Sequence, residues 1–265
     1  MKIITLVENM AIYNYKSTHG LSFYIETNKH KILFDLGPDD TFLINAKKNN
    51  IDIKDVDIVI ISHGHYDHGG GLRTFININN KAKIYIQEKA FNNYYSIVDG
   101  VKKYIGLDKD IKNNENIILI NGDYKIDDEL YLFVAEYGYD FRSEANDTLF
   151  NEYDKDIFNH EQNLLINNNV LLIGCGHAGV INILNKLERK PNYCIGGFHV
   201  YNPRLQTTVS KEQLDYLNDK LDAYENIKFY TCHCTGLEAY EYLSNKHPNI
   251  KYIKCGEQLI CENNF

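Results

Sequence analysis

The sequence predicts a layered α/β fold with a mixed sheet. Its first third is rich in short β-branched and aromatic runs, and its second half alternates apolar runs with amphipathic segments. Strands that later alternate with helices are typical of this architecture. The 265 residues are enough to bury a substantial core. We expect a single domain over residues 1–265, with a flap or insertion around residues 91–125, where Asn, Lys and Tyr are frequent.

In the first ninety residues, β-branched and aromatic runs predict strands, and apolar residues at helical spacing predict helices. Asp39 or Asp40 is the expected N-cap of the first helix. The run 55–62 is almost continuously apolar, which is typical of a strand buried on both faces. The expected strands are residues 2–9, 21–27, 30–37, 55–62 and 81–90, and the expected helices are residues 39–50 and 71–80.

In the second half, the same patterns predict strands that alternate with helices. The segment 162–179 contains two strands joined by a turn at "INNNV", where Asn tolerates left-handed backbone. Ser210 is the expected N-cap of an amphipathic helix. The expected strands are residues 129–138, 191–200, 227–236 and 250–260, and the expected helices are residues 179–189, 210–224 and 237–248.

Charge and apolar patterning exclude several classes of function. The net charge is −8 and no block of Lys and Arg occurs, which argues against a generic nucleic-acid partner. No apolar run is long enough for a membrane helix. The first residues resemble a strand and not a secretory signal, because Glu8 interrupts them. We therefore expect a cytoplasmic protein with reduced cysteines.

The stretch "SHGHYDHGGGL", residues 62–72, has three histidines and an aspartate within six positions, directly after a predicted buried strand. His63 and His65 are two residues apart, so extended backbone puts them on one side. Asp67 and His68 follow where "DHGG" starts a helix. Imidazoles with one carboxylate suit zinc, and also iron or manganese. The pattern therefore predicts that His63 and His65 hold one metal ion, and Asp67 and His68 a second.

Three further histidines follow predicted apolar strands, as His63 does. They are His177, His199 and His233. In layered α/β folds, ligands and catalytic groups gather at the carboxyl ends of strands. By contrast, His30 and His247 resemble surface residues. Cys232 and Cys234 flank His233 and are expected to point away from it on extended backbone, as small buried residues.

These motifs resemble the metallo-β-lactamase superfamily. "HGHYDH" matches its H-x-H-x-D-H motif, and "ILFDLG", with Asp35, matches its first motif. The segments "GCGHAGVINI", "GGFH" and "TCHCTG" resemble one branch, which is labelled by similarity to a dihydropterin–ribofuranosylaminobenzene phosphate synthase of methanopterin biosynthesis. The resemblance implies a four-layer αββα sandwich with a dinuclear metal site.

Carried over by position, the resemblance implies six metal ligands and a set of neighbouring residues. Asp35 is expected to accept the other ring N–H of a ligand histidine. The neighbouring or pocket residues are Asp35, Cys175, His160, His19, Glu8 and Asn9. The ligands are His63, His65, Asp67, His68, His177 and His233.

Two departures from the family pattern leave alternatives open. The family usually has a bridging Asp after a late strand, where this chain has Cys175, so the bridge is either water alone or a Cys175 ligand. His160 is an alternative to His177 as the third histidine, and His177 is preferred because it follows a buried strand. His199 is either a proton donor to the leaving group or a lining residue.

The resemblance implies a hydrolase in which two divalent ions generate hydroxide near neutral pH. Asp67 and His199 are the expected catalytic residues, and the expected substrate is a small phosphorylated molecule such as a phosphodiester. The ions are expected to be zinc, with iron or manganese as alternatives. The second hypothesis is a synthase that joins a dihydropterin diphosphate to an aminobenzene ribofuranose phosphate. A diiron redox protein and a non-catalytic metal-binding module rank lower, and homo-oligomerisation is left open.

Overall fold

The computed structural model describes residues 1–138 and 140–262, and its chain divides into two compact units. Unit 1 comprises Met1–Asn92, Gly106–Asn121 and the described residues from Ile253 onward. Unit 2 comprises Asn93–Ile105 and the described residues of Gly122–Tyr252. Within the described residues, each unit contains one seven-stranded sheet. The α/β class predicted from the sequence is confirmed.

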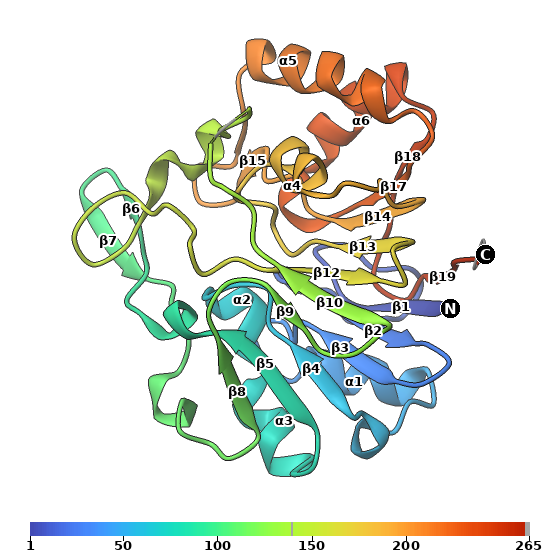
Figure 1. Cartoon of the computed structure of the whole chain (residues 1–265). Coiled ribbons are helices and arrows are strands. Elements are labelled where there is room, and N and C mark those ends of the chain that lie inside the picture. The colour runs from blue at the N-terminus through green and yellow to red at the C-terminus, as the bar shows by residue number, and fades with distance from the viewer. Residues whose placement is uncertain (139, 263–265) are drawn as a thin grey trace. The chain divides into compact units, whose positions relative to one another are not determined.

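The sheet of unit 1 has the order β19-β1-β2-β3-β4-β5-β8 (Figure 1). Pairing is antiparallel from β19 to β3 and parallel from β3 to β8. The strands are β1 (Lys2–Val7), β2 (Ser22–Glu26), β3 (Lys31–Phe34), β4 (Ile58–Ile60), β5 (Lys83–Gln87), β8 (Ile117–Ile120) and β19 (Gln258–Ile260). The helices are α1 (Thr41–Lys48), α2 (Tyr66–Gly69) and α3 (Leu72–Ile78), with 3-10 turns at Ile53–Asp55, Glu88–Phe91 and Lys109–Ile111.

The helices α1 and α3 pack apolar side chains against this sheet. Phe42 and Ala46 of α1 and Phe75 of α3 belong to one buried cluster with Val59 and Ile84 of the strands. These residues are fully buried, so the helical spacing seen in the sequence marks the face that each helix turns to the sheet. The α1 N-cap is Asp40, but the carboxylate that bonds the helix start belongs to Asp39, which accepts from Thr41 N at 2.8 Å.

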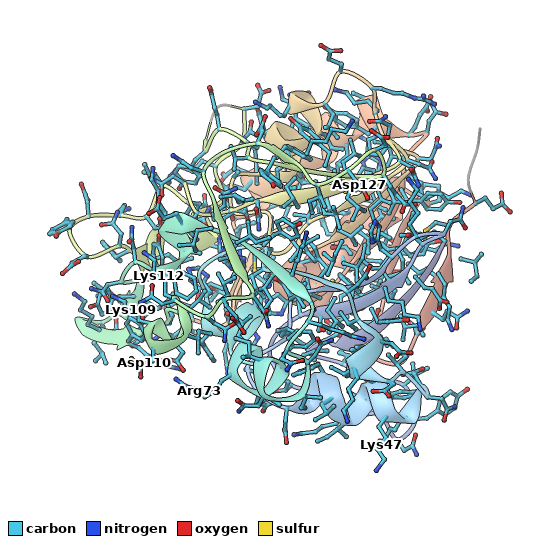
Figure 2. The ribbon with its side chains drawn as sticks, turned by 60° about the horizontal axis from the view of Figure 1, so that its bottom comes forward. Lys47, Arg73, Lys109, Asp110, Lys112 and Asp127 are labelled. Carbon is cyan, nitrogen blue, oxygen red and sulfur yellow. The ribbon has the colours of Figure 1, made fainter. Side chains whose placement is uncertain are left out.

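Part of the range 91–125 belongs to the unit 1 sheet. Its strand β8 pairs in parallel with β5. Arg73 of α3 forms ion pairs with Asp108 and, at 3.8 Å, with Asp110, at the 3-10 turn Lys109–Ile111. Figure 2 labels Arg73 and Asp110. The remaining part is a hairpin of β6 (Tyr95–Val98) and β7 (Val101–Tyr104) in unit 2. That this range is a flap or insertion stays a prediction.

The sheet of unit 2 has the order β18-β17-β14-β13-β12-β10-β9. Pairing is parallel from β18 to β13 and antiparallel from β13 to β9. The strands are β9 (Tyr124–Lys125), β10 (Leu130–Phe133), β12 (Asn163–Ile166), β13 (Val170–Leu172), β14 (Tyr193–Gly196), β17 (Lys228–Thr231) and β18 (Ile250–Tyr252). Short pairs are formed by β11 (Leu149–Phe150) with β6, and by β15 (Tyr201–Asn202) with β16 (Thr207–Thr208).

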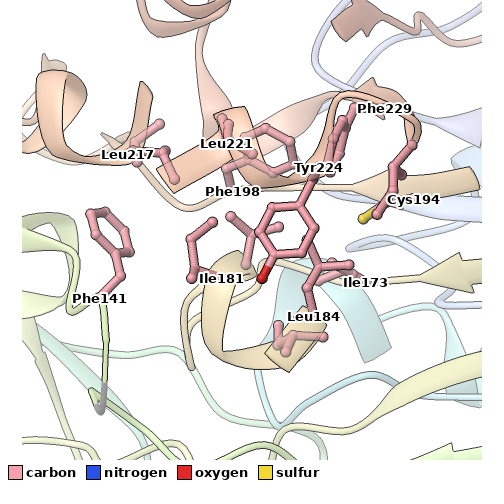
Figure 3. Close-up of a cluster of buried hydrophobic side chains, with 14 of the residues drawn as sticks. Phe141, Ile173, Ile181, Leu184, Cys194, Phe198, Leu217, Leu221, Tyr224 and Phe229 are labelled. Atoms are coloured by element: carbon pink, nitrogen blue, oxygen red, sulfur yellow. The ribbon is translucent and has the colours of Figure 1, made fainter. Parts of the chain in front are cut away.

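The helices of unit 2 bury their apolar stripes in a second core (Figure 3). Leu217 and Leu221 of α5 lie with Ile181 of α4 and Phe229 of β17 in this core. Ser210 is the N-cap of α5, and its Oγ accepts from Gln213 N at 3.4 Å, which confirms that prediction. The helices are α4 (Val180–Lys186), α5 (Lys211–Leu221) and α6 (Leu237–Lys246), with 3-10 turns at Glu144–Thr148, Asp222–Tyr224 and His233–Thr235.

Two local predictions are wrong. The expected strand 250–260 is two strands, β18 and β19, in different sheets. The turn between them contains Gly256, whose φ of +90° breaks extended backbone. His247 is 5% exposed and not a surface residue, because its Nε2 pairs with the carbonyl of Asn218 at 2.8 Å. Among the described residues, no helix is both long and apolar enough to cross a bilayer.

Candidate metal-binding residues

In unit 1, the motif residues follow the carboxyl end of β4, next to the end of β3. The chain turns after β3 at Asp35, which has a φ of +59°. Backbone bonds hold the motif to this turn: Asp35 N donates to Ile60 O at 2.8 Å, and Leu36 N donates to His68 O at 2.7 Å. The parallel pairing of β3 with β4 therefore brings Asp35 and the motif together.

The three motif imidazoles of unit 1 are buried and in contact. His63 and His68 are fully buried and His65 is 5% exposed. The His63 ring lies 4.6 Å from the His65 ring and 4.1 Å from the His68 ring, between centroids. His63 Nε2 and His65 Nδ1 are 3.1 Å apart. Asp67 and His68 lie in α2, so the predicted helix is confirmed, whereas the backbone bends at His63 and Gly64 and is extended only at His65.

Asp35 binds the ring of His68 in unit 1. Its Oδ2 lies 2.6 Å from His68 Nδ1, and both groups are fully buried. The same carboxylate accepts from Ser62 N and Ser62 Oγ, each at 2.7 Å. Ser62 Oγ also lies 2.8 Å from His63 Nδ1. One buried carboxylate thus fixes two histidine rings through hydrogen bonds, and the sequence analysis did not single out Ser62, the residue that links them.

The other unit 1 residues, His19, Glu8 and Asn9, make different kinds of contact. His19 Nε2 is 3.2 Å from an oxygen of Asp67. Glu8 is fully buried, but its carboxylate accepts from Met10 N at 2.6 Å. Asn9 Oδ1 accepts from Gly20 N at 3.4 Å. Thus His19 contacts a motif residue, whereas Glu8 and Asn9 bond the backbone of their own loops.

In unit 2, the candidate residues follow β13, β14 and β17, which are neighbouring parallel strands. Cys175 Sγ lies within 4.8 Å of a ring nitrogen of His177, of His199 and of His233. His177 and His199 also contact each other, with centroids 4.0 Å apart. His199 and His233 have φ of +47° and +51°, a region that non-glycine residues adopt at a cost. The strand ends therefore gather the thiols of Cys175 and Cys234 and three imidazoles.

Neighbouring residues hold His177 in place. Its Nδ1 lies 2.8 Å from Asn146 Oδ1, and Asn146 Nδ2 donates to its carbonyl at 3.1 Å. Phe158 stacks on the ring with centroids 4.3 Å apart. Buried Glu161 accepts from His177 N at 2.7 Å, and from Ala178 N at 2.8 Å. Burial raises the pKa of Glu161 more than these bonds lower it.

His160 lies in a different setting from His177. Its Nε2 is 2.9 Å from Asp156 Oδ2, and both side chains are buried. The ring packs on Tyr94 with centroids 4.0 Å apart. The sequence analysis singled out neither Asp156 nor Glu161, although Glu161 directly follows His160 in the chain. Which histidine binds metal stays a prediction.

The cysteines that flank His233 are buried, as predicted, but the backbone at His233 is not extended, so the argument that both point away from it does not hold. His233 has a φ of +51° and begins the 3-10 turn His233–Thr235. Cys234 Sγ therefore lies near Cys175, 3.4 Å from its carbonyl oxygen. Burial raises the pKa of Cys234, but contacts with Cys175 and with the rings of His199 and His233 outweigh burial and lower it.

Comparison with known proteins identifies the family. Residues 17–159 match the model of the metallo-beta-lactamase superfamily. An uncharacterised protein of Methanocaldococcus jannaschii is 30% identical over 90% of this chain and 92% of its own. A 7,8-dihydropterin-6-methyl-4-(β-D-ribofuranosyl)-aminobenzene-5'-phosphate synthase of that organism is 29% identical, over 90% of this chain and 89% of its own.

A solved structure agrees with the sequence matches. It is described as a metal-dependent hydrolase of the β-lactamase superfamily. The similarity has a TM-score of 0.82 at 26% identity and covers 99% of this chain and all of the other. The fold predicted from the sequence is therefore confirmed, and this fold typically binds divalent metal ions in hydrolases. The chain belongs to the metallo-β-lactamase superfamily.

Proposed function

We propose that this protein is a hydrolase that uses two divalent cations to cleave a small phosphorylated substrate, a phosphodiester or phosphoester. The proposed ligands are His63, His65, Asp67, His68, His177 and His233.

The separation of two ring nitrogens in unit 1 carries this proposal. His63 Nε2 and His65 Nδ1 are 3.1 Å apart. Two imidazole nitrogens bound to one tetrahedral zinc ion at 2.0–2.1 Å lie about 3.3 Å apart. The pair is therefore already spaced for one cation.

The donor chemistry also fits a divalent cation. Ser62 Oγ contacts His63 Nδ1, and Asp35 contacts His68 Nδ1. A carboxylate that accepts the Nδ1 proton keeps Nε2 unprotonated, as a metal ligand must be. Neutral imidazoles with one carboxylate favour zinc, with iron and manganese as alternatives.

Bound divalent cations lower the pKa of a water molecule and neutralise charge that develops on the substrate. Asp67 is proposed to ligate a cation and to accept a hydrogen bond from the attacking water. His199 is proposed to donate a proton to the leaving oxygen. Its ring is 5% exposed, and neither nitrogen has a hydrogen bond of ordinary geometry within the described residues, which supports this role.

Phosphate recognition is proposed for the hairpin β6–β7. Lys102 Nζ lies 3.7 Å from the centroid of the Tyr95 ring. Arg204 binds the hairpin backbone through the carbonyls of Ser96 and Val101. A cation and an aromatic face side by side suit a phosphate joined to a ring system.

The second candidate is a synthase that joins a dihydropterin diphosphate to an aminobenzene ribofuranose phosphate and releases pyrophosphate. One relative is named as such a synthase, and this favours the second candidate. It is 29% identical to this chain, and the match covers 89% of the relative's length. The second candidate uses the same proposed ligands, so only a reaction product separates the two functions.

Metal content tests the centre that both candidates share. Protein purified without added metal should hold about two zinc, iron or manganese ions per chain by mass spectrometry. His68→Ala and His177→Ala should each lose one ion, whereas His30→Ala should retain both, because His30 pairs with Asp57 outside the motif. One ion or none in the wild type contradicts the proposal. A His177→Ala protein that keeps both points to His160 as the ligand.

Reaction products then separate the two functions. The metal-loaded protein should hydrolyse an aryl phosphodiester and release the aryl alcohol, and His199→Ala should lower kcat more than KM. A condensation product that forms only when a dihydropterin diphosphate and an aminobenzene ribofuranose phosphate are both present would favour the synthase. Pyrophosphate should be released in the same reaction.

A further inference from the structure

A buried hydroxyl group of unit 2 holds the backbone of His199. His199 follows β14 and has a φ of +47°, which non-glycine residues adopt at a cost. The Oγ of Ser143 donates a hydrogen bond to the carbonyl oxygen of His199. Ser143 is 1% exposed and His199 is 5% exposed, so solvent does not compete for this carbonyl. The hydroxyl group therefore stabilises the left-handed backbone that carries the His199 ring.

A second hydrogen bond fixes the direction of the Ser143 hydroxyl group. Its Oγ accepts from Ala145 N at 3.2 Å, because Ser143 is the N-cap of the 3-10 turn Glu144–Thr148. A hydroxyl group has one donor hydrogen and two lone pairs. Since the amide of Ala145 occupies a lone pair, the hydrogen is directed at the His199 carbonyl.

The turn that follows Ser143 is anchored to two other segments of unit 2. The carboxylate of Glu144 accepts from Ser210 N at 2.8 Å and from Ser210 Oγ at 2.9 Å, at the N-terminus of α5. Asn202 Nδ2 donates to Thr148 Oγ1 at 2.9 Å. Both ends of the turn are thus tied to the rest of the unit, so Ser143 is a fixed support for His199.

The His199 ring takes its position from the backbone and from packing. Within the described residues, neither of its ring nitrogens has a hydrogen bond of ordinary geometry. The ring packs on His177 with centroids 4.0 Å apart, and Asn146 of the same turn holds the His177 ring through Nδ1. One turn therefore contacts the backbone that carries the first ring and the ring nitrogen of the second, which sets the two rings relative to each other.

We propose that Ser143 is a positioning residue, which aims the His199 ring at the leaving oxygen by holding the His199 carbonyl. This inference rests on the proposed function, because it takes His199 as the proton donor. In that step the bond between phosphorus and the leaving oxygen breaks and its electron pair goes to the oxygen. The oxygen takes the proton from a ring nitrogen of His199, and Ser143 keeps its own proton throughout.

Loss of the hydroxyl group should displace the ring. In Ser143→Ala, the buried carbonyl of His199 loses its donor, so the backbone there is expected to relax away from its left-handed conformation. A displacement of about 1 Å of a reacting group costs up to about 100-fold in rate. The loss is confined to the step that His199 assists, so kcat should fall and KM should change little.

Leaving groups of different acidity test this role. A departing 4-nitrophenolate needs little help from a proton donor, whereas a departing phenolate needs more. In the metal-loaded enzyme, His199→Ala should lower kcat about 100-fold or more on a phenyl phosphodiester and far less on the 4-nitrophenyl compound. Ser143→Ala should show the same pattern with a loss of about 10–100-fold on the phenyl compound. Ser143→Thr, which keeps the hydroxyl group, should restore the rate.

The matched control is Thr41→Val. Thr41 is fully buried in unit 1 and its hydroxyl group donates to Asp39, so this variant also loses one buried donor. It should keep the wild-type ratio of the two rates. Where Ser143→Ala does not fold, Ser143→Cys gives the same test, because a thiol is of similar size and a weak donor.

Nuclear magnetic resonance of the metal-free protein gives a readout that does not depend on activity. With histidines labelled at Cε1, the His199 signal is the one that His199→Ala removes. It should move or broaden in Ser143→Ala, whereas the signal of His247, which is bound to the Asn218 carbonyl, should stay in place.

The outcomes separate this inference from the proposed function. An unmoved His199 signal in Ser143→Ala overturns the positioning role. A wild-type ratio of rates in Ser143→Ala, when His199→Ala changes that ratio, also overturns it and leaves the proposed function intact. If His199→Ala itself keeps the wild-type ratio, His199 is not the proton donor, and the proposed function fails at that step.

Discussion

Replacing Asp35 by Asn should weaken metal binding while the fold is kept. The carboxylate contacts three groups, namely Ser62 N, Ser62 Oγ and His68 Nδ1, at 2.6–2.7 Å. A carboxamide can keep its oxygen on Ser62 N and turn its NH₂ toward the other two. His68 Nδ1 must then accept, so its proton moves to Nε2, and a protonated Nε2 cannot bind a cation.

The magnitudes separate this effect from a loss of stability. Loss of an outer hydrogen bond to a metal ligand typically lowers metal affinity about 10–100-fold. All three contacts keep a partner in Asp35→Asn, and the left-handed backbone at residue 35, φ +59°, is one that Asn tolerates. In Asp35→Ala, three buried groups lose their partner at about 1–3 kcal/mol each, which approaches the whole stability of a typical domain.

The assay is a competition titration with a chelator, with urea unfolding of the metal-free protein alongside. Asp57→Asn is the matched control, because Asp57 also binds a histidine ring, His30 Nδ1 at 2.8 Å, at an exposed position. The control should bind metal as the wild type does. A folded Asp35→Asn protein with wild-type affinity for both cations would refute the role given to this carboxylate.

Three further predictions concern stability. Burial, and then the charges of Glu26, Asp55 and Asp57, raise the pKa of Tyr24 to about 12. An unfolded tyrosine ionises near pH 10, so the contribution of this raised pKa to the free energy of unfolding is present below pH 10 and is lost as the pH rises toward 12. Urea unfolding between these pH values should therefore show a smaller loss of stability in Tyr24→Phe than in the wild type. In the turn between β12 and β13, Asn168 has a φ of +51°, so Asn168→Gly should fold normally and Asn168→Val should lower the free energy of unfolding by about 1–2 kcal/mol. Leu217→Ala should cost about 2–5 kcal/mol in denaturant unfolding, because Leu217 is fully buried in the unit 2 core; a cost below 1 kcal/mol would contradict the packing.

The sequence was most informative where a local pattern fixes the backbone. The Asn-rich turn is an example, because Asn167 and Asn168 both adopt left-handed φ, as "NNN" indicated. The segment "DHGG" likewise indicated a helix, and Asp67 and His68 lie in α2. Both depend on residues within a few positions of each other, so no tertiary contact was needed to infer them.

Contacts between distant residues could not be inferred in this way. Nothing local shows that Ser62 links Asp35 to His63, or that His247 packs on a carbonyl of another helix. The split of residues 250–260 into two strands also depends on which sheets receive them. The proposed set of metal ligands likewise cannot be inferred from local sequence, because its residues are far apart in the chain. It stays a proposal.

The pairing of β1 with β19 has a consequence for synthesis. Met1 N donates to Cys261 O at 3.1 Å, and Cys261 N donates to Met1 O at 3.0 Å, so these two distant segments of unit 1 form one ladder. On the ribosome, the outer edge of β1 stays open until Gln258–Ile260 has emerged. An uncovered edge strand pairs readily with other chains, so nascent chains and chains cut before β19 should be prone to aggregate and to depend on chaperones.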